Sequence, residues 1–237
     1  MRFVYTILSM IVLSTAALAQ PQWEVGAFIG LANYQGDLVK ETFPLFKEGN
    51  PAFGFSGRYV YDYTWSFRGN FTIGKITGDD VNYRSDEFRA GRNARFENTL
   101  AELSGAVEWE PFGEWRYLSG MGFKKMISPY IFAGVGFTFT GLDAQYPAPE
   151  TVSPGMALLL AQDKNANFSK TLIVLPVGLG VKFDLSEYWF LGLEFGMRYA
   201  FTDYLDGISK AGNPDKNDWY QFSGFQVVHR LRNTRRR

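Results

Sequence analysis

The sequence predicts an all-β protein, namely an eight-stranded antiparallel up-and-down transmembrane β-barrel with a filled polar lumen. Three observations support this prediction. Apolar and polar residues alternate along eight segments, as lipid on one side and a polar lumen on the other require of a membrane strand. Aromatic residues form 17% of the 237 residues, and glycine occurs 25 times. No stretch after residue 19 is apolar for long enough to cross a membrane as a helix.

The first 19 residues have the pattern of a secretory signal peptide. Arg2 supplies the positive end, residues 3–12 are apolar, and the Ala-Leu-Ala of residues 17–19 supplies small side chains around a cleavage point. We therefore expect a cleaved signal peptide and an export route that ends outside the inner membrane.

Three regions follow from this division: the signal peptide at 1–19, an outer-membrane β-barrel at 20–230 and a basic periplasmic tail at 231–237. The chain has no cysteine, which excludes a lipoprotein anchor, a disulfide framework and a thiolate metal site. Its formal net charge of zero gives no overall field that would favour nucleic acid as a partner.

The alternating segments define the expected strands, which in chain order are 23–31, 52–61, 65–77, 97–109, 130–140, 172–183, 188–200 and 218–230. The pattern is clearest in the seventh, where the side chains of Glu194 and Arg198 oppose those of Phe195 and Tyr199. The eighth alternates poorly, and its outward face stays unassigned. A soluble β-sandwich would also alternate, but it does not explain the many aromatic residues near the strand ends.

Loop lengths predict an orientation. The connections at 62–63 and 184–187 are short, whereas those at 32–51, 78–96, 141–171 and 202–217 are long. Bacterial barrels place short turns in the periplasm and long loops outside. Both termini are therefore expected in the periplasm, and the segment 110–129 becomes an unusually long periplasmic turn.

The inward faces of the expected strands carry charges of both signs. The four cations are Arg58, Arg68, Lys182 and Arg198, and the four anions are Glu24, Glu102, Glu108 and Glu194. An eight-stranded barrel is just wide enough for its own side chains to fill it, and an unpaired buried charge is very costly. We expect these eight side chains to pair and to form a neutralised plug and not a pore.

Catalytic and metal-binding patterns are weak. The only histidine is His229, at the periplasmic end of the last strand, and no nucleophile elbow, zinc-protease motif or phosphate loop occurs. Asp79-Asp80 and Asp203 with Asp206 could bind calcium, but carboxylates in polar outer loops are more often solvated, and EF-hand spacing is absent. The sequence therefore predicts no catalytic residue, no cofactor and no metal site.

The stretch "NYQGDL" at 33–38 follows directly on the first strand. Asn and Gly tolerate a left-handed backbone, and an Asp side chain can bond nearby N–H groups. We interpret the stretch as structural punctuation, a tight turn at a strand exit.

This motif also carries a resemblance to a known family. The stretches "EVGAFIGLANYQGDL" at 24–38, "LEFGMRYAFTDYLDGIS" at 193–209 and "DWYQFSGFQV" at 218–227 resemble the PorG-like outer-membrane barrels of the type IX secretion and gliding machinery. The turn residues that carry the resemblance are Asn33, Tyr34, Gly36, Asp37, Asp203, Tyr204 and Asp206. The final "HRLRNTRRR" is more basic than is usual in that family.

The resemblance implies a scaffold and no enzyme. It implies an eight-stranded barrel in contact with outer-membrane lipids, which anchors periplasmic ring proteins of the PorK and PorN type. No catalytic residues are carried over with it.

A periplasmic partner would find two candidate surfaces in this chain. The long turn offers aromatic and basic residues suited to interface anchors, namely Trp115, Arg116, Tyr117, Phe123, Lys124 and Lys125. The tail offers Arg230, Arg232, Arg235, Arg236 and Arg237, which could pair with an acidic protein surface. A solvated turn and a disordered tail are the alternatives.

Two further functions stay open. A narrow barrel can pass small solutes or hydrophobic ligands, and "GMALLLAQ" at 155–162 could line a lateral opening, form a short helix or pack on the barrel rim. A surface adhesin acting through the outer loops is the third possibility, which nothing in their composition favours.

Overall fold

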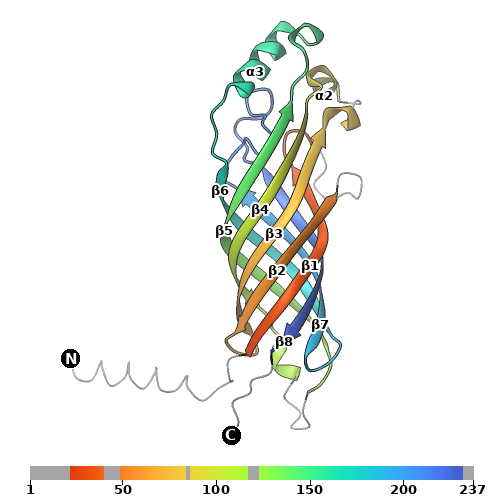
Figure 1. Ribbon diagram of the computed structural model, residues 1–237. Coiled ribbons are helices and arrows are strands. Elements are labelled where there is room, and N and C mark those ends of the chain that lie inside the picture. Colours follow the sequence, from red (N-terminus) through yellow and green to blue (C-terminus); the bar gives the residue numbers. More distant parts are fainter. Residues whose placement is uncertain (1–21, 40–48, 84–85, 117–122, 232–237) are drawn as a thin grey trace, which may run out of the picture.

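The computed structural model describes residues 22–39, 49–83, 86–116 and 123–231, and within them eight antiparallel strands close into a barrel (Figure 1). Each strand pairs with the next in the sequence, and β8 pairs with β1. The strands are β1 (Gln22–Gln35), β2 (Asn50–Val60), β3 (Trp65–Asp79), β4 (Arg95–Trp109), β5 (Ile127–Gln145), β6 (Thr171–Asp184), β7 (Trp189–Ala200) and β8 (Trp219–Arg230). The predicted fold class is confirmed.

The two ends of the barrel differ, and we name them by their connections. The turn end holds residues 61–64 between β2 and β3 and residues 185–188 between β6 and β7. At both turns a side-chain oxygen fixes the reversal. Asp62 Oδ1 accepts from the N–H groups of Thr64 and Trp65. Ser186 Oγ accepts in the same way from the N–H groups of Tyr188 and Trp189. Short polar turns therefore close this end.

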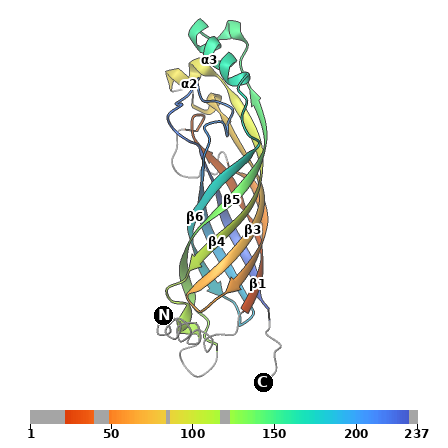
Figure 2. The same cartoon turned by 90° about the vertical axis from the view of Figure 1, so that its left-hand side faces the viewer.

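The loop end carries the long connections and most of the helical residues (Figures 1 and 2). The elements there are η2 (Asp80–Tyr83), α2 (Glu87–Arg92), η4 (Pro149–Thr151) and α3 (Pro154–Lys164). The short helix η3 (Gly113–Arg116) lies instead at the turn end. Ser153 caps α3 by accepting from the N–H of Met156, and Pro154 occupies its first position. Of the three possibilities for residues 155–162, the structure shows a helix.

Apolar side chains cover the outer wall of the barrel. The exposed ones on the strands include Trp23, Ile29, Phe53, Phe55, Phe67, Phe71, Leu103, Ile131, Phe137, Phe139, Ile173, Leu179, Leu193, Phe225 and Val227. Such a continuous apolar surface is far larger than a soluble monomer exposes, and it suits a bilayer. The chain is therefore a membrane β-barrel, and the β-sandwich alternative is wrong. No helix among the described residues is long and apolar enough to span a membrane.

Pairing with β1 and β7 shows which side chains of β8, the strand that alternates poorly, point into the lumen. Gln226 pairs with Phe28 of β1 and with Gly192 of β7, so it shares their inward face. Phe225 and Val227 then face outward and are exposed. The pairing with the two adjoining strands therefore fixes the outward face of β8, which its own sequence did not indicate.

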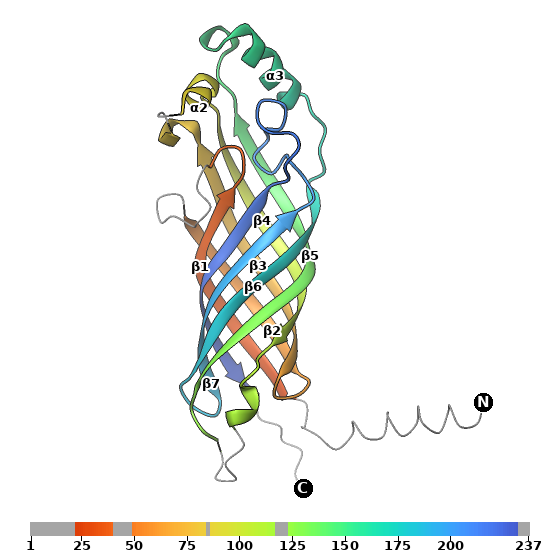
Figure 3. The same cartoon turned by 180° about the vertical axis from the view of Figure 1, so that it is seen from behind.

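The inside of the barrel has two zones along its axis. The turn-end half is filled by charged side chains. The loop-end half is filled by an apolar core, whose buried members include Ala32, Leu38, Ala52, Ile76, Phe96, Leu100, Val174, Ala200, Leu205, Ile208, Ala211, Tyr220 and Phe222. Leu205, Ile208 and Ala211 come from the connection between β7 and β8, which therefore folds back into the mouth of the barrel (Figure 3).

Candidate functional site

Eight charged side chains form a closed ring across the turn-end half of the lumen. Taken around the ring they alternate in sign, in the order Arg58, Glu24, Arg230, Asp184, Arg116, Glu110, Lys182 and Glu108, and Glu108 pairs back to Arg58. All eight are buried. Representative separations are 2.7 Å from Arg58 Nη1 to Glu24 Oε2 and 2.6 Å from Arg230 Nη2 to Asp184 Oδ1. The four cations balance the four anions, so each buried charge of the ring has partners of opposite sign.

An aromatic side chain packs against three of the four cations of this ion-pair ring. Phe190 of β7 is 1% exposed. The guanidinium carbons of Arg58 and Arg230 lie 5.5 and 4.8 Å from its centroid, and Lys182 Nζ lies 5.5 Å from it. Cations over an aromatic face are attracted by its quadrupole. Phe190 is thus buried against Arg58, Arg230 and Lys182 and supports their positions.

A second tier of charges lies closer to the middle of the barrel. Arg68 Nη1 is 2.5 Å from Glu194 Oε2, which also accepts from the Tyr130 hydroxyl at 2.8 Å and from the Gln226 amide at 2.7 Å. Further along, Arg198 pairs with Glu102 at 3.1 Å. Glu102 also accepts hydrogen bonds from the hydroxyls of Tyr220 and Ser104.

The structure therefore brings together inside the lumen all eight charges singled out from the sequence, Glu24, Arg58, Arg68, Glu102, Glu108, Lys182, Glu194 and Arg198. Sequence reasoning missed four more, namely Glu110, Arg116, Asp184 and Arg230. Two of these carry a signal, because Glu110 and Asp184 lie two positions beyond the inward-facing Glu108 and Lys182. Arg230 carries none in the sequence, because the facing of its strand was not assigned. Arg116 carries none, since it enters the lumen from η3.

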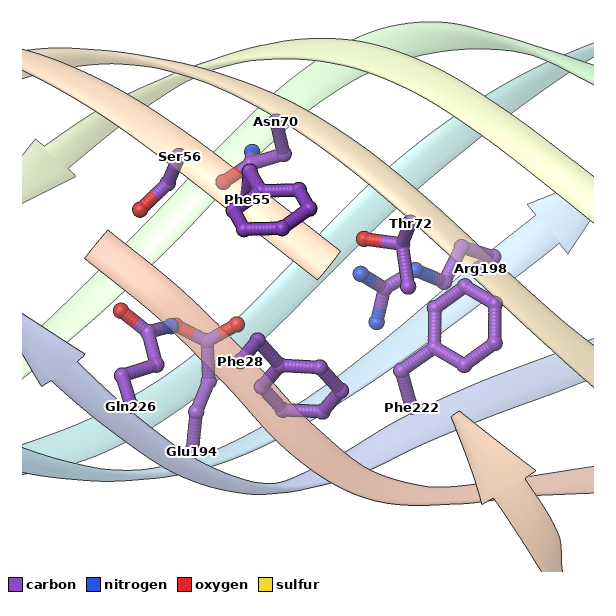
Figure 4. Close-up of a pocket in the computed structure, with 9 residues that line it drawn as sticks. All are labelled: Phe28, Phe55, Ser56, Asn70, Thr72, Glu194, Arg198, Phe222 and Gln226. Carbon is purple, nitrogen blue, oxygen red and sulfur yellow. The ribbon is translucent and has the colours of Figure 1, made fainter. Parts of the chain in front are cut away.

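A small cavity lies within the second tier, beside Glu194 and Arg198 (Figure 4). Its volume is about 20 Å³, which suits roughly one water molecule. Glu194 and Gln226 lie together on one side of it, and Arg198 and Thr72 lie on the other. Polar groups that surround a space of this size are suited to hold water and leave no room for a solute.

Two residues expected to contact a partner are instead structural. Arg116 donates through Nε to Asp184 Oδ2 at 2.6 Å and pairs with Glu110, so it ties η3 to the barrel. Arg230, counted above with the basic tail, ends β8 and belongs to the same ring. The expectation that these two arginines are exposed is wrong, because both are needed to neutralise buried carboxylates.

The other described residues of the long turn differ in their exposure to solvent and in their contacts. Trp115 is 57% exposed and packs on Phe112, with ring centroids 4.9 Å apart. Lys124 and Lys125 are exposed, and the Lys124 N–H donates to the Arg116 carbonyl at 2.9 Å. Phe123 is half-buried, with Arg230 5.6 Å from its ring centroid. Tyr117, Arg232, Arg235, Arg236 and Arg237 lie outside the described residues.

At the loop end, charged side chains fasten the β7–β8 connection. Arg92 of α2 donates to both carboxylate oxygens of Asp80 at 2.8 Å, and also to the carbonyls of Ala211 and Asp37 at 3.0 and 2.9 Å. Asp163 of α3 accepts from the N–H groups of Lys210 and Ala211, each at 2.9 Å. Two separate helices therefore hold the same connection in the barrel mouth.

The carboxylates of the outer loops are mostly not solvated, contrary to the sequence-based expectation. Asp80 and Asp206 are buried, and Asp203 is half-buried, with burial raising the pKa of its carboxyl to about 6. Asp79 accepts from the N–H of Val81 at the start of η2. Among the residues that the structure describes, no group of three or more acidic or histidine side chains is arranged to hold a metal ion.

The "NYQGDL" stretch is more than a strand exit. The Tyr34 hydroxyl lies 2.7 Å from Asp206 and 2.6 Å from Asp218, and it accepts from the Asp37 N–H at 3.0 Å. A Cβ at Gly36 would stand 1.9 Å from that hydroxyl, so only glycine fits there. Asp37 Oδ2 accepts from the N–H of Asn213 at 2.9 Å.

The remaining motif residues lie around the same cluster. Asn33 is buried beside Tyr34. Tyr204 stacks on Phe168 with centroids 5.5 Å apart. The predicted tight turn at the exit of β1 is present, with Gly36 and Val39 bridged across it. The sequence did not predict its second role: the motif residues around Tyr34 and Asp206, 172 positions apart in the sequence, fasten the β7–β8 connection to β1.

The fold is similar to those of solved outer-membrane proteins. Neisserial surface protein A superposes with a TM-score of 0.53 at 14% identity, covering 90% of this chain and 100% of that one. OprG from Pseudomonas aeruginosa gives 0.44 at 11%, with 90% and 98% covered. Ail of Yersinia pestis, in complex with the heparin analogue sucrose octasulfate, gives 0.46 at 10%, with 90% and 100% covered. The first of these likenesses shows a shared barrel fold and nothing about activity.

No curated protein matches the sequence. The pattern of one family, described as a domain of unknown function (DUF6089), matches residues 1–234. The chain therefore belongs to the DUF6089 family.

Proposed function

We propose that this protein is a non-enzymatic structural barrel of the bacterial outer membrane that anchors a periplasmic protein through its turn end. The observation that carries the proposal is an exposed aromatic and basic surface held rigidly to the barrel wall. We call it the turn-end platform and define it as Phe112, Trp115, Lys124 and Lys125. The first two residues supply exposed aromatic area, and the last two supply positive charge.

Rigidity is what distinguishes the platform from an ordinary solvated turn. The segment between β4 and β5 is joined to the lumen by Arg116, whose partners Glu110 and Asp184 are themselves buried. The Arg116 carbonyl in turn accepts from Lys124 N–H. A surface that is ordered before binding loses less conformational entropy on association, which favours affinity.

The filled lumen favours an anchoring role over passage of a solute. The ion-pair ring, with Phe190 packed against its cations, fills one end, and the β7–β8 connection packs into the barrel at the other. A solute would have to break several buried ion pairs, each costly to open. Short turns at one end place that end in the periplasm if the usual asymmetry of bacterial barrels holds, and the platform then faces the periplasm.

The resemblance to PorG-like barrels suggests which partner this is. It points to periplasmic ring proteins of the PorK and PorN type, within a type IX secretion apparatus. The chemistry of the platform fits a partner with an acidic surface and a pocket for tryptophan, because aromatic residues at the centre of an interface supply most of its binding energy.

A cross-linked, detergent-solubilised pull-down of the tagged protein from outer membranes tests the proposal. We expect stoichiometric recovery of periplasmic proteins with the wild type, and loss of that recovery when Trp115→Ala, Lys124→Ala and Lys125→Ala are combined. Phe88→Ala serves as the matched control, because Phe88 is exposed to a similar degree on α2 at the opposite end. Unchanged recovery with the triple variant would refute the platform as an anchor.

Two further arms separate the remaining alternatives. Deleting residues 231–237 tests the basic tail, and loss of the partner there with retention in the triple variant would move the contact to the tail. Conductance of the purified barrel in planar bilayers tests passage of solutes. Steady conductance in the wild type would favour a channel and count against a filled structural barrel.

A further inference from the structure

The most unusual arrangement outside the ion-pair ring lies at the loop end, where one tyrosine hydroxyl joins two carboxyl groups. Tyr34 Oη is 2.7 Å from Asp206 Oδ2 and 2.6 Å from Asp218 Oδ1. All three side chains are nearly inaccessible, at 4%, 0% and 2% exposure. We call this trio the carboxyl latch.

Counting hydrogens shows that the latch needs an extra proton. A phenol has one hydrogen and can donate it to only one of the two carboxyl oxygens. Two ionised carboxylates would leave the second short contact without a hydrogen between its oxygens. The second carboxyl group must therefore carry a proton and donate it to Tyr34 Oη, which has acceptor capacity beside the Asp37 N–H.

The other oxygen of each carboxyl group is already engaged. Asp206 Oδ1 accepts from the N–H of Ile208 at 2.8 Å, and Asp218 Oδ2 accepts from the N–H of Leu205 at 2.9 Å. Both donors belong to the β7–β8 connection, and Tyr34 belongs to β1. The latch therefore joins the connection to the barrel wall, and one of its two contacts with Tyr34 depends on the extra proton.

The surrounding charges do not replace that proton. Arg92 is a cation that acts on Asp206, and it is engaged by Asp80 and by two backbone carbonyls. Three other titratable groups act on the latch: Asp37 after β1, Tyr146 after β5, and Asp203 on the β7–β8 connection itself. Asp163 of α3 and Lys210 lie at the far side of the same connection. Acidic groups dominate this neighbourhood, so ionising both carboxyl groups is opposed.

We propose that one proton shared between Asp206 and Asp218 latches residues 201–218 into the loop end, so that this end closes tightly in acid and loosens as the medium becomes alkaline. The two carboxyl groups act as a pair with Tyr34 as the bridge. Loss of the proton leaves two buried anions on one hydroxyl and opens the connection.

The pKa values of both carboxyl groups agree with this arrangement. Burial raises the pKa of Asp206 to about 8, and burial together with the charge of Asp206 raises the pKa of Asp218 well above its ordinary value. Since the closed form binds the proton more tightly than the open form, closure is strongest below the ordinary aspartate pKa near 4 and weakens as pH rises to about 8.

Hydrogen exchange of the full-length protein in lipid vesicles tests the latch. Protection of amides in residues 202–218, corrected for intrinsic exchange rates, should fall by about tenfold per pH unit between roughly pH 5 and pH 8 and then level off, because one proton is released on opening. Protection of the strand amides should not follow this slope. Wild-type protection that stays constant over the same range would overturn the proposal.

Two matched substitutions sharpen the test. In Asp218→Asn the amide replaces the protonated carboxyl group as a donor to Tyr34, so the slope should disappear while the connection stays closed. In Asp163→Asn a second buried anchor of the same connection is weakened, and there protection should fall at every pH with the slope retained. A slope that persists in Asp218→Asn would also overturn the proposal.

A spectroscopic measurement covers the case in which a variant does not fold. The infrared carbonyl band of a protonated carboxylic acid should titrate in the wild type near pH 8, as expected for Asp206 and above the pKa of about 6 of Asp203, and should be lost by pH 10. No such band titrating over this range would mean that both groups are ionised when the loop end is closed, which contradicts the latch.

Discussion

At the scale of single residues, two glycines on adjacent strands face opposite sides of the barrel wall. Gly105 of β4 points outward, where an added Cβ would meet nothing within 4 Å. Gly134 of β5 points inward, where a Cβ would stand 2.1 Å from the carbonyl oxygen of Gly105. Backbone atoms cannot yield as a flexible side chain can, so the two sites differ in what they tolerate.

We therefore expect Gly134→Ala to lower the free energy of unfolding by about 1–3 kcal/mol, the usual cost of forcing extra volume into a packed interior. Gly105→Ala should change it by less than about 0.5 kcal/mol, as is common for surface positions. Urea unfolding in lipid vesicles, followed by tryptophan fluorescence, measures both. Equal effects at the two sites would contradict the inward facing of Gly134.

Residue-level roles were predictable only where period two applies. Glu24, Arg58 and Lys182 could be assigned to the lumen because their strands alternate, and the structure places them there. Arg116 could not, because a side chain that enters the lumen from a short helix obeys no strand period. Tyr34 and Asp206 looked like turn residues because their contact spans 172 positions of sequence.

At the scale of elements, η3 depends on the barrel for its position. Among the described residues, the other seven members of the ion-pair ring lie in a strand or directly next to one. Arg116 alone comes from a separate element, η3. Removing Arg116 would leave Glu110 and Asp184 with fewer cations in a buried setting, which is strongly destabilising for buried pairs.

Arg116→Ala should therefore release the segment between β4 and β5 while the strands stay paired. We expect trypsin to cleave at Lys124 and Lys125 at least about tenfold faster than in the wild type, because cleavage requires local opening of this segment. Trp115→Ala is the control, since that side chain is exposed and carries no ion pair in the ring. Equal cleavage rates in wild type and Arg116→Ala would show that Arg116 does not hold the turn.

At the scale of the whole molecule, an apolar wall surrounds a neutral polar and aromatic interior. This arrangement is inverted relative to a soluble protein and is stable only in a bilayer, where every backbone polar group must be paired within the barrel. The outer wall is thus part of the stability of the fold, and a charge placed on it should be costly.

Phe55→Arg provides that test, because Phe55 is 70% exposed on β2 and pairs with Phe71 and Ala27 on the flanking strands. We expect a loss of about 2–4 kcal/mol in unfolding free energy in vesicles if the side chain lies near the bilayer midplane. Phe88→Arg on α2 should cost much less, because α2 lies beyond the barrel wall at the loop end. Similar losses for both variants would argue against a lipid-facing wall.

The sequence by itself determined the strands, their number and eight of the charges that they turn inward, because alternation is a local property that each strand carries alone. It left the facing of β8, the burial of Arg116 and Arg230, and the role of the "NYQGDL" motif undecided. Only the tertiary structure settled these, since closing the barrel brings β8 beside β1 and folds the β7–β8 connection onto Tyr34. Contacts between residues that are distant in sequence follow from that closure and leave no periodic trace in the sequence.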